Sequence, residues 1–270
     1  MKIGNKEFQT KGRTYCMGIL NITPDSFSDG GKFLKKDDAL KQVEKMLAEG
    51  VDLLDVGGES TRPGYERISA QEETERVVPV IEAVKAEFDI PVSLDTYKPE
   101  VALDGIRAGA DMINDIWGLK YEESMAGIIA ESGLPCCLMH NRKEAVYEDF
   151  MQEVAADLAL TVRIAQKAGI ADDKIILDPG VGFAKTCGQN LELIHCMEEL
   201  SVLGYPLLLG ASRKSVIGLT LDLPACDRLE GTLATTVLAV MKGCMFVRVH
   251  DIKENVRAIR MTEAILGAGK

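Results

Sequence analysis

The sequence has no excess of basic charge, no long apolar run and no C-x-x-C pair of cysteines. Its 270 residues carry 31 Lys and Arg against 42 Asp and Glu, which gives a formal net charge of −11. Nucleic acids and anionic membranes bind basic surfaces, so this balance argues against both as partners. An anionic ligand would need positive charge that is concentrated locally.

No apolar run approaches the roughly 20 residues that span a bilayer, and charges interrupt residues 1–10, where a signal peptide has its apolar core. We therefore expect a soluble, cytoplasmic protein. The seven cysteines are an odd number without a C-x-x-C pair, and most lie in or beside apolar runs. This pattern favours reduced, buried thiols over zinc or disulfide chemistry, with Cys187 as the exposed exception.

Eight short apolar runs alternate with helix-like stretches along the whole chain, and no linker-like segment interrupts them. Strands buried on both faces have this Val/Ile/Leu-rich character. The pattern predicts a single α/β domain over residues 1–270, a (β/α)8 TIM barrel, with an open doubly wound sheet as the alternative. The predicted strands are residues 16–20, 53–56, 92–94, 112–113, 136–139, 175–177, 207–209 and 246–249.

Local signals support the helices between these runs. Ser69 and Glu72 predict a capping box, Pro99 suits a first helical position, and Asp251 with Glu254 is expected to cap the last helix. Gly4-Asn5, between two short β-like pieces, predicts an N-terminal β-hairpin that plugs the barrel floor.

Polar side chains follow the apolar runs, and in a barrel the residues just past the strands line one mouth. Cations follow three of the runs, and their convergence favours a phosphate-type site. The residues concerned are Arg62, Lys214, Arg248 and His250. Backbone amides at Gly57-Gly58 could approach an oxyanion closely. The alternative is that these cations are solvated or paired with Glu59, Asp178 or Asp251.

A second group of strand ends is acidic or amide. Asp95, Asn114 and Asp178 offer acceptors that suit a 2-aminopyrimidinone edge, whereas we assign Asp115 and Asp251 to structure. Mg²⁺ usually takes one or two protein oxygens along with phosphates and water, and Asn21 and Asp95 are the candidates.

Two long polar segments, residues 22–32 and 57–68, follow the first two strands. Most loops in α/β units have about 2–6 residues, and longer ones are often lids. We interpret both as mobile covers over the phosphate end, in which Phe27 excludes water.

The same segments resemble the signatures of the dihydropteroate synthase family. Residues 17–31 (MGILNITPDSFSDGG) are similar to its first signature and residues 55–64 (DVGGESTRPG) to its second. Shorter matches follow in order at residues 93–96, 114–116, 139–140, 178–183, 210–214 and 248–251, so that the resemblance spans essentially the whole chain.

The resemblance implies a transferase of folate biosynthesis that joins 4-aminobenzoate to (7,8-dihydropterin-6-yl)methyl diphosphate, forms 7,8-dihydropteroate and releases diphosphate. By analogy, the pterin is held by Asp95, Asn114, Asp178 and Lys214. The diphosphate faces Thr61, Arg62, Arg248 and His250, and Asn21 ligates Mg²⁺. The aminobenzoate is bordered by Phe27, Pro63, Phe183 and Ser212, where sulfonamides should compete. The family's usual homodimer is a further expectation.

The chemistry needs no covalent nucleophile, because the aniline nitrogen is neutral and nucleophilic at pH 7. We expect Asp95, Lys214 and Arg248 to be catalytic, with a dissociative path in which Asp95 stabilises positive charge on the pterin side. Three alternatives are a pterin-dependent methyltransferase, a Schiff-base aldolase that uses Lys185 or Lys214, and a non-catalytic pterin-binding paralogue.

Some residues have open roles. Asn141-Arg142 departs from the run that many relatives carry after His140, and His140 could be only a buried polar partner. Trp117 lies over a substrate or, in the interpretation we favour, fills a gap between helices. Apolar residues of the last two helices could form an interface or pack on the barrel: Leu233, Val237, Val240, Ile259 and Ile265.

Overall fold

The structure, a computed structural model, describes residues 1–23, 32–60 and 67–268, and within them eight parallel strands form one sheet. In chain order they are β3 (Tyr15–Asn21), β4 (Leu53–Gly57), β5 (Val92–Asp95), β6 (Met112–Asp115), β7 (Cys136–Met139), β8 (Ile175–Asp178), β9 (Leu208–Leu209) and β10 (Phe246–Val249). From β3 to β8 each strand pairs with the next, β10 pairs with both β3 and β9, and an isolated parallel bridge from Leu177 to Leu207 joins β8 to the residue before β9. The predicted barrel is therefore confirmed, and the open sheet is wrong.

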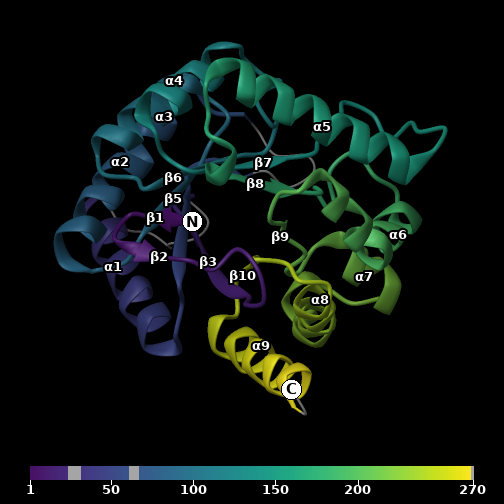
Figure 1. The fold of residues 1–270 in the computed structure, drawn as a ribbon. Helices are drawn as coiled ribbons and strands as arrows, with labels where there is room; N and C mark the ends of the chain where they lie inside the picture. The colour runs from purple at the N-terminus through teal and green to yellow at the C-terminus, as the bar shows by residue number, and fades with distance from the viewer. Residues whose placement is uncertain (24–31, 61–66, 269–270) are drawn as a thin grey trace.

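Helices connect the strands and cover the outside of the barrel (Figure 1). They are α1 (Lys32–Glu49), α2 (Ala70–Glu87), α3 (Pro99–Arg107), α4 (Ser124–Ser132), α5 (Phe150–Ala168), α6 (Cys187–Cys196), α7 (Ser215–Leu221), α8 (Leu229–Met241) and α9 (Ile252–Gly267), with short 3-10 turns at 172–174, 197–203 and 225–227. In the described part of the chain, every helix is too short or too polar to cross a bilayer.

The helix starts follow the predicted signals in part. Ser69 Oγ accepts from the Glu72 amide at 3.1 Å, but the Glu72 carboxylate bonds Arg76, so only half of that capping box forms. Pro99 opens α3 as predicted. The side-chain cap at Asp251 is wrong: Asp251 precedes α9, but its carboxylate is paired with Arg213. That pair offers a guanidinium with two donors, which is a stronger partner than a helix amide.

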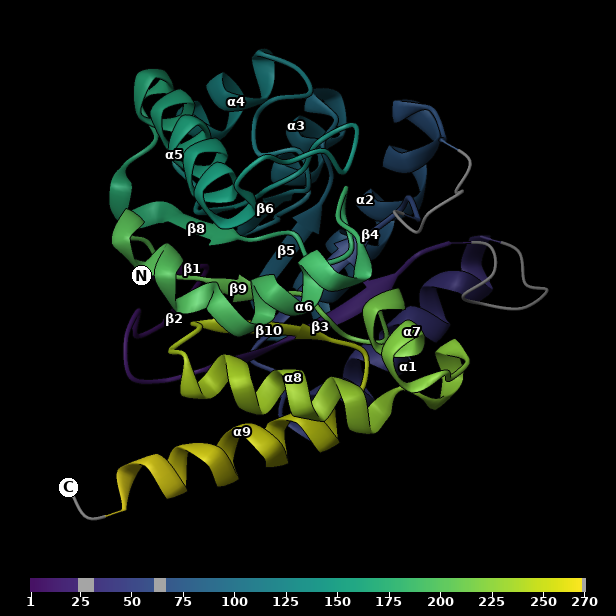
Figure 2. The same ribbon diagram turned by 90° about the vertical axis from the view of Figure 1, so that its right-hand side faces the viewer.

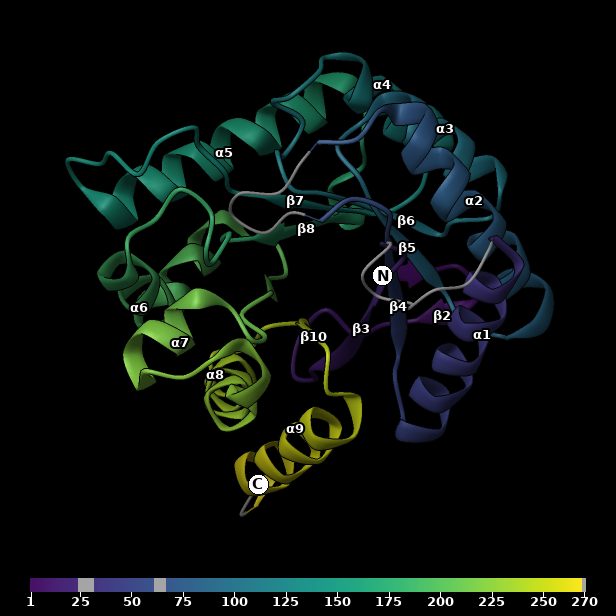
Figure 3. The ribbon, with the colours of Figure 1, turned by 180° about the vertical axis from the view of Figure 1, so that it is seen from behind.

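The N-terminal hairpin closes one end of the barrel, as predicted. Strands β1 (Lys2–Ile3) and β2 (Lys6–Glu7) pair antiparallel, and Ile3 and Phe8 are buried in the cluster that fills the barrel interior. Figure 2 shows this hairpin at one end of the barrel and α7, which follows β9, at the other. The opposite mouth, at the carboxyl ends of the strands, faces the viewer in Figure 3.

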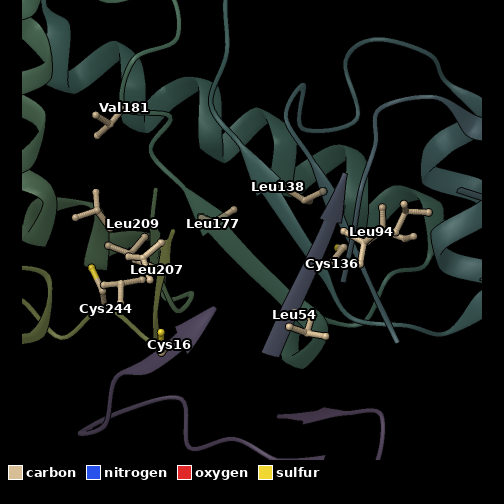
Figure 4. Close-up of a cluster of buried hydrophobic side chains, with 14 of the residues drawn as sticks. Cys16, Leu54, Leu94, Cys136, Leu138, Leu177, Val181, Leu207, Leu209 and Cys244 are labelled. Atoms are coloured by element: carbon tan, nitrogen blue, oxygen red, sulfur yellow. The ribbon is translucent and has the colours of Figure 1, made fainter. Parts of the chain in front are cut away.

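Alternation along the strands separates two apolar layers. Leu54, Leu94, Leu138 and Leu177 face outward and pack against the helices (Figure 4). Leu53, Met112, Cys137 and Ile176 face inward and fill the floor with Phe246. Successive side chains on a strand point to opposite faces, so the next inward side chain, two residues closer to the carboxyl end of its strand, lines the mouth.

The four thiols in or beside the apolar runs are buried as expected. Cys16, Cys136, Cys137 and Cys244 are buried, and Cys187 is half-buried rather than exposed. The exposed thiol is Cys226, which lies in the short turn before α8.

Candidate functional site

A buried ion-pair network crosses the mouth of the barrel. The Arg248 guanidinium, on β10, donates from Nε to Asp55 on β4 and from Nη2 to Asp95 on β5. Asn114 on β6 donates from Nδ2 to the same oxygen of Asp55 at 3.2 Å. These side chains meet because each occupies an inward position near the carboxyl end of its strand.

Asp178 and Lys214 lie at the same mouth. A Cβ atom added to Gly210 would lie 3.5 Å from Asp178 Oδ2, 3.8 Å from Lys214 Nζ and 4.0 Å from Arg248 Cβ. The bare backbone at Gly210 therefore leaves room beside an acceptor and a cation. Lys214 Nζ also donates to the Val181 carbonyl, which ties the loop after β8 to the start of α7.

The charges in this mouth do not balance. The side chains of Asp55, Asp95 and Asp178 are all largely buried and face two cations, Arg248 and Lys214. Burial raises the pKa of Asp95 to about 7, against the opposing effect of Arg248. Burial likewise lowers the pKa of Lys214 to about 8, against the opposing effect of Asp178. The site thus holds groups that can exchange protons near neutral pH.

An unsatisfied acceptor marks where a ligand could bind. Among the described residues, Asp55 Oδ1 and Ser93 Oγ are buried without a hydrogen-bond partner. A buried carboxylate oxygen without a donor is costly. Asp55 therefore suits a ligand that brings its own N–H group. Sequence reasoning missed this residue, although a carboxylate within the apolar strand β4 was the available signal.

The loops after β9 and β10 are locked together. Ser212 Oγ lies 3.0 Å from His250 Nδ1 and accepts from the His250 amide at 3.2 Å. Arg213 adopts a left-handed backbone (φ 55°) and pairs with Asp251 through two hydrogen bonds. Arg213 is thus engaged away from the mouth, and the next residue, Lys214, enters it.

Asn21 ends β3 beside the acidic side of the mouth. In register it lies opposite Gly57, which in turn lies opposite Asp95. A Cβ on Gly57 would be 3.7 Å from Asp95 Oδ2 and 3.9 Å from Asn21 Oδ1. The amide oxygen and the carboxylate thus flank one open backbone position.

An apolar rim lies beside the charged mouth. Tyr97, Ile116 and Met139 form a buried cluster, and the half-buried Trp117 and Phe183 pack against it. The Lys214 ammonium lies 4.6 Å from the centre of the Phe183 ring. This contact places Phe183 where the charged and apolar parts of the site meet.

His140 lies behind the mouth, not in it. It is fully buried, with Nε2 3.0 Å from Asp157 on α5 and Nδ1 2.9 Å from Lys185 Nζ. The preceding Met139 faces inward, so alternation turns His140 outward toward α5. Its interpretation as a buried polar partner is confirmed. Arg142, in the departing segment, donates to Asp157 at 2.6 Å and joins the same network.

Both flanks of the second long loop are fastened by one lysine. Lys98 donates to Glu59 and Glu73, each at 2.6 Å, and to the Ile68 carbonyl at 2.9 Å. Tyr97 donates to Glu59 at 2.7 Å. Glu59 is thus paired with Lys98, a partner that the sequence did not suggest.

The structure brings most of the predicted site residues to one mouth. Asp95, Asn114, Asp178, Lys214 and Arg248 lie there, His250 and Ser212 are bonded to each other, and Asn21 and Phe183 are at the edges. Asp115 is structural as predicted, since it accepts from the amides of Trp117 and Leu119. Phe27, Thr61, Arg62 and Pro63 lie outside the described residues, as do most of the two proposed covers.

Fold and site together define a barrel whose mouth is lined by acidic and amide side chains, with Arg248 and Lys214 among them. Comparisons with known proteins assign the class. The family model for pterin binding enzymes matches residues 17–250. The chain therefore belongs to the pterin-binding enzyme family.

Within that family the relatives are dihydropteroate synthases. The enzyme of that name from Clostridium beijerinckii is 58% identical over 267 residues, covering 98% of this chain and 99% of its own. A Clostridium difficile dihydropteroate synthase structure, determined in the presence of pteroic acid, is 47% identical with a TM-score of 0.92 and 98% of both chains covered. The Xanthomonas albilineans enzyme with 4-aminobenzoic acid is 40% identical with a TM-score of 0.91, over 95% of this chain and 94% of the other.

Proposed function

We propose that this protein is a dihydropteroate synthase. It transfers the (7,8-dihydropterin-6-yl)methyl group from its diphosphate ester to the amino group of 4-aminobenzoate. The observation that carries the proposal is the convergence of Asp95, Asn114, Asp178, Lys214 and Arg248 at one mouth of a chain that is 58% identical to a dihydropteroate synthase.

The acid- and amide-lined side of the mouth suits the pterin. Asp178 presents Oδ2 toward the open position beside Gly210, while its Oδ1 accepts from the Gly180 amide at 2.7 Å. A carboxylate fixed in this way can accept from the 2-amino and ring N–H groups of a pterin. Asn114 and Lys214 supply donors for the ring's acceptors. Asp55, with one unpaired oxygen, is an additional acceptor on the same side.

Arg248 and His250, at the end of β10 and just after it, suit the diphosphate. His250 follows β10 beside Ser212, and Thr61 and Arg62 follow β4 in the sequence. Arg248 already uses Nε and Nη2 on Asp55 and Asp95, so its approach to the diphosphate is coupled to the state of those carboxylates. The proposed border of the 4-aminobenzoate is Phe183 and Ser212, together with Phe27 and Pro63 of the two long loops, and we expect sulfonamides to compete there.

Magnesium fits this site as a companion of the diphosphate. Among the described residues no group of three or more His, Cys, Asp or Glu side chains could hold a metal by itself. Asn21 and Asp95 offer two oxygens beside Gly57, which matches the one or two protein ligands that Mg²⁺ takes when phosphates and water supply the rest. Bound there, Mg²⁺ would supply positive charge next to the leaving diphosphate.

The reaction needs orientation and charge stabilisation. The bond from the pterin methylene carbon to the diphosphate oxygen breaks, a bond to the aniline nitrogen forms, and that nitrogen loses one proton. Negative charge on the leaving group faces Arg248 and His250, while Asp95 stabilises positive charge on the pterin methylene. Lys214 holds the ring beside Phe183, where the aniline approaches.

The test is incubation with the pterin diphosphate and 4-aminobenzoate, with and without Mg²⁺. We expect a product of the mass of dihydropteroate, one diphosphate for each product, dependence on Mg²⁺ and inhibition by a sulfonamide. Pterin binding without turnover would favour a non-catalytic paralogue, and methyl transfer a related methyltransferase. Covalent trapping of Lys185 or Lys214 by borohydride with a carbonyl substrate would favour the aldolase. Asn21→Ala should raise the Mg²⁺ concentration needed for half-maximal rate.

We also propose a cytoplasmic homodimer. Apolar side chains stay exposed on α8 and α9, which pack side by side: Leu238, Met241, Met261, Ile265 and Leu266. Of the predicted interface residues, Val240 and Ile259 are buried in the core, Leu233 and Val237 are half-buried, and Ile265 is exposed. Sedimentation of the wild type and of Met241→Glu tests the dimer, and cell fractionation tests the compartment.

A further inference from the structure

The loop after β8, residues 179–186, carries Phe183 and is pinned by one buried lysine. Lys185 Nζ donates to the carbonyl oxygens of Gly180 at 2.9 Å and of Phe183 at 3.0 Å, and it lies 2.9 Å from His140 Nδ1. An ammonium group has three donors, so these three acceptors use all of them.

The partners of the loop lie on both sides of it. Tyr147 donates to the Ala184 carbonyl at 3.0 Å, and Asn190 on α6 accepts from the Gly182 amide at 2.6 Å. Lys214 contacts both the Val181 carbonyl and the Phe183 ring. The position of Lys214 in the mouth therefore depends on the conformation that Lys185 holds.

We propose that Lys185 is a positioning residue for the transfer reaction, which fixes the loop at residues 179–186 and through it Phe183 and Lys214. The proposal rests on the proposed function, since it assigns Phe183 and Lys214 to that reaction. Lys185 itself contacts backbone oxygens and His140, so it acts through the loop.

The network requires the charged form of Lys185. His140 Nδ1 accepts from Lys185, so Nε2 carries the proton that is donated to Asp157. A neutral amine has only two N–H donors for the three acceptors. If His140 instead donated from Nδ1, its bare Nε2 would face the Asp157 carboxylate. Loss of the Lys185 proton therefore breaks at least one bond of the network.

The Lys185 ammonium loses its proton readily, so the bonds that it makes to the loop are sensitive to pH. Burial lowers the pKa of Lys185 to about 7. The charged groups around it come from several elements: Asp178 of β8 favours the ammonium, whereas Lys214, Arg142 and Lys120 oppose it. Asp157 of α5 faces it only through His140. The ammonium form is thus complete below neutral pH and is lost as the pH rises.

The test compares Lys185→Met and Lys185→Arg with the wild type and with Lys167→Met, which removes an exposed lysine of α5. Hydrogen exchange of the peptide that covers residues 179–186 reports the loop without reference to activity. We expect protection about tenfold lower in Lys185→Met, because a charge-assisted bond is lost. In the wild type protection should fall from pH 6 to pH 9 after correction for intrinsic exchange.

Kinetics give the second readout. The KM for 4-aminobenzoate should rise about tenfold in Lys185→Met. The KM for the pterin diphosphate should change less, because its partner Asp178 is held in place by the pairing of β8 with β7. In the wild type and in Lys167→Met, the KM for 4-aminobenzoate should rise above neutral pH, where the Lys185 ammonium is lost. Lys185→Arg keeps its charge to high pH, so its KM should not show this rise. Unchanged hydrogen exchange in Lys185→Met would overturn the proposal. So would a lower Tm accompanied by equal fold-changes in kcat and in both KM values, since that pattern indicates a general structural defect. If the wild type is inactive but the exchange pattern is as expected, the proposed function is refuted, whereas the role of Lys185 in fixing the loop is supported.

Discussion

Arg248 and Asp95 form an ion pair across the mouth of the barrel, 153 residues apart in the chain. Strands β5 and β10 are not neighbours in the sheet, since β4 and β3 lie between them. The same guanidinium bonds Asp55 on β4, so one cation serves two buried carboxylates. Arg248 is therefore the cation that neutralises most of the charge of these two carboxylates.

Arg248→Met should therefore damage both stability and activity. Removing one partner of a buried pair leaves the other charge uncompensated, at a cost of about 3–5 kcal/mol. We expect kcat/KM to fall at least about a hundredfold, and Lys should rescue little because it lacks the planar fork. Urea unfolding and steady-state kinetics measure the two effects. The double variant with Asp55→Asn should regain stability but not activity, and wild-type behaviour of Arg248→Met would refute the role.

Asp95→Asn should lose far more rate than pterin affinity. The amide keeps the shape of the side chain but not the negative charge that opposes developing positive charge on the pterin methylene. Since burial raises the pKa of Asp95 to about 7, its carboxylate form accumulates as the pH rises through neutrality. In the wild type kcat should rise over that interval, and in the variant this rise should be absent. Comparable losses in kcat and in pterin affinity would count against the assignment.

His140 should make the fold sensitive to acid. Burial is the main cause that lowers the pKa of His140 to about 3, and the nearby charges of Lys185 and Lys120 add to it. In the unfolded chain the pKa of this histidine is near 6.5. Between these values the unfolded chain binds the extra proton, so stability falls as the pH drops from about 6.5 toward 3. His140→Asn should remove this part of the slope, which is on the order of a few kcal/mol. Urea unfolding over this pH range measures the slope, and the exposed His195→Asn is the control variant.

Gly180→Ala should disrupt the loop after β8 more than its backbone angle alone predicts. Gly180 has φ 75°, and a Cβ there would lie 2.0 Å from the His140 carbonyl oxygen. Gly204 has a similar φ of 82° but open space around it, so Gly204→Ala measures the cost of the angle by itself. We expect the first variant to be less stable than the second by about 1–3 kcal/mol, from overpacking. Equal unfolding free energies would show that the loop yields without cost.

Much of the architecture followed from local patterns. The eight apolar runs matched β3 to β10 within a residue or two at each end, because strands buried on both faces need continuous apolar blocks. Asp95 and Asp178 end their strands and Asn114 is the last residue but one of β6, so their positions at the mouth followed once the barrel closed. The hairpin followed from Gly4, whose positive φ suits a tight turn.

Choices between partners did not follow from the sequence. Asp251 was expected to cap a helix and instead binds Arg213, and Glu59 binds Lys98. Arg248 was assigned to the diphosphate, yet its guanidinium is engaged by two carboxylates. Each of these choices depends on which charges lie within bonding distance in a buried setting, and no sequence spacing encodes that distance.

The amino-acid sequence by itself determined the repeating strand–helix order and the identity of the polar groups at the strand ends, because both depend on short-range periodicity. Only the tertiary structure decided that Asp55 joins Asp95 under Arg248 and that His140 faces α5 rather than the mouth. Barrel closure brings residues from distant strands within a few ångströms, and burial then makes each unpaired charge costly enough to select its partner.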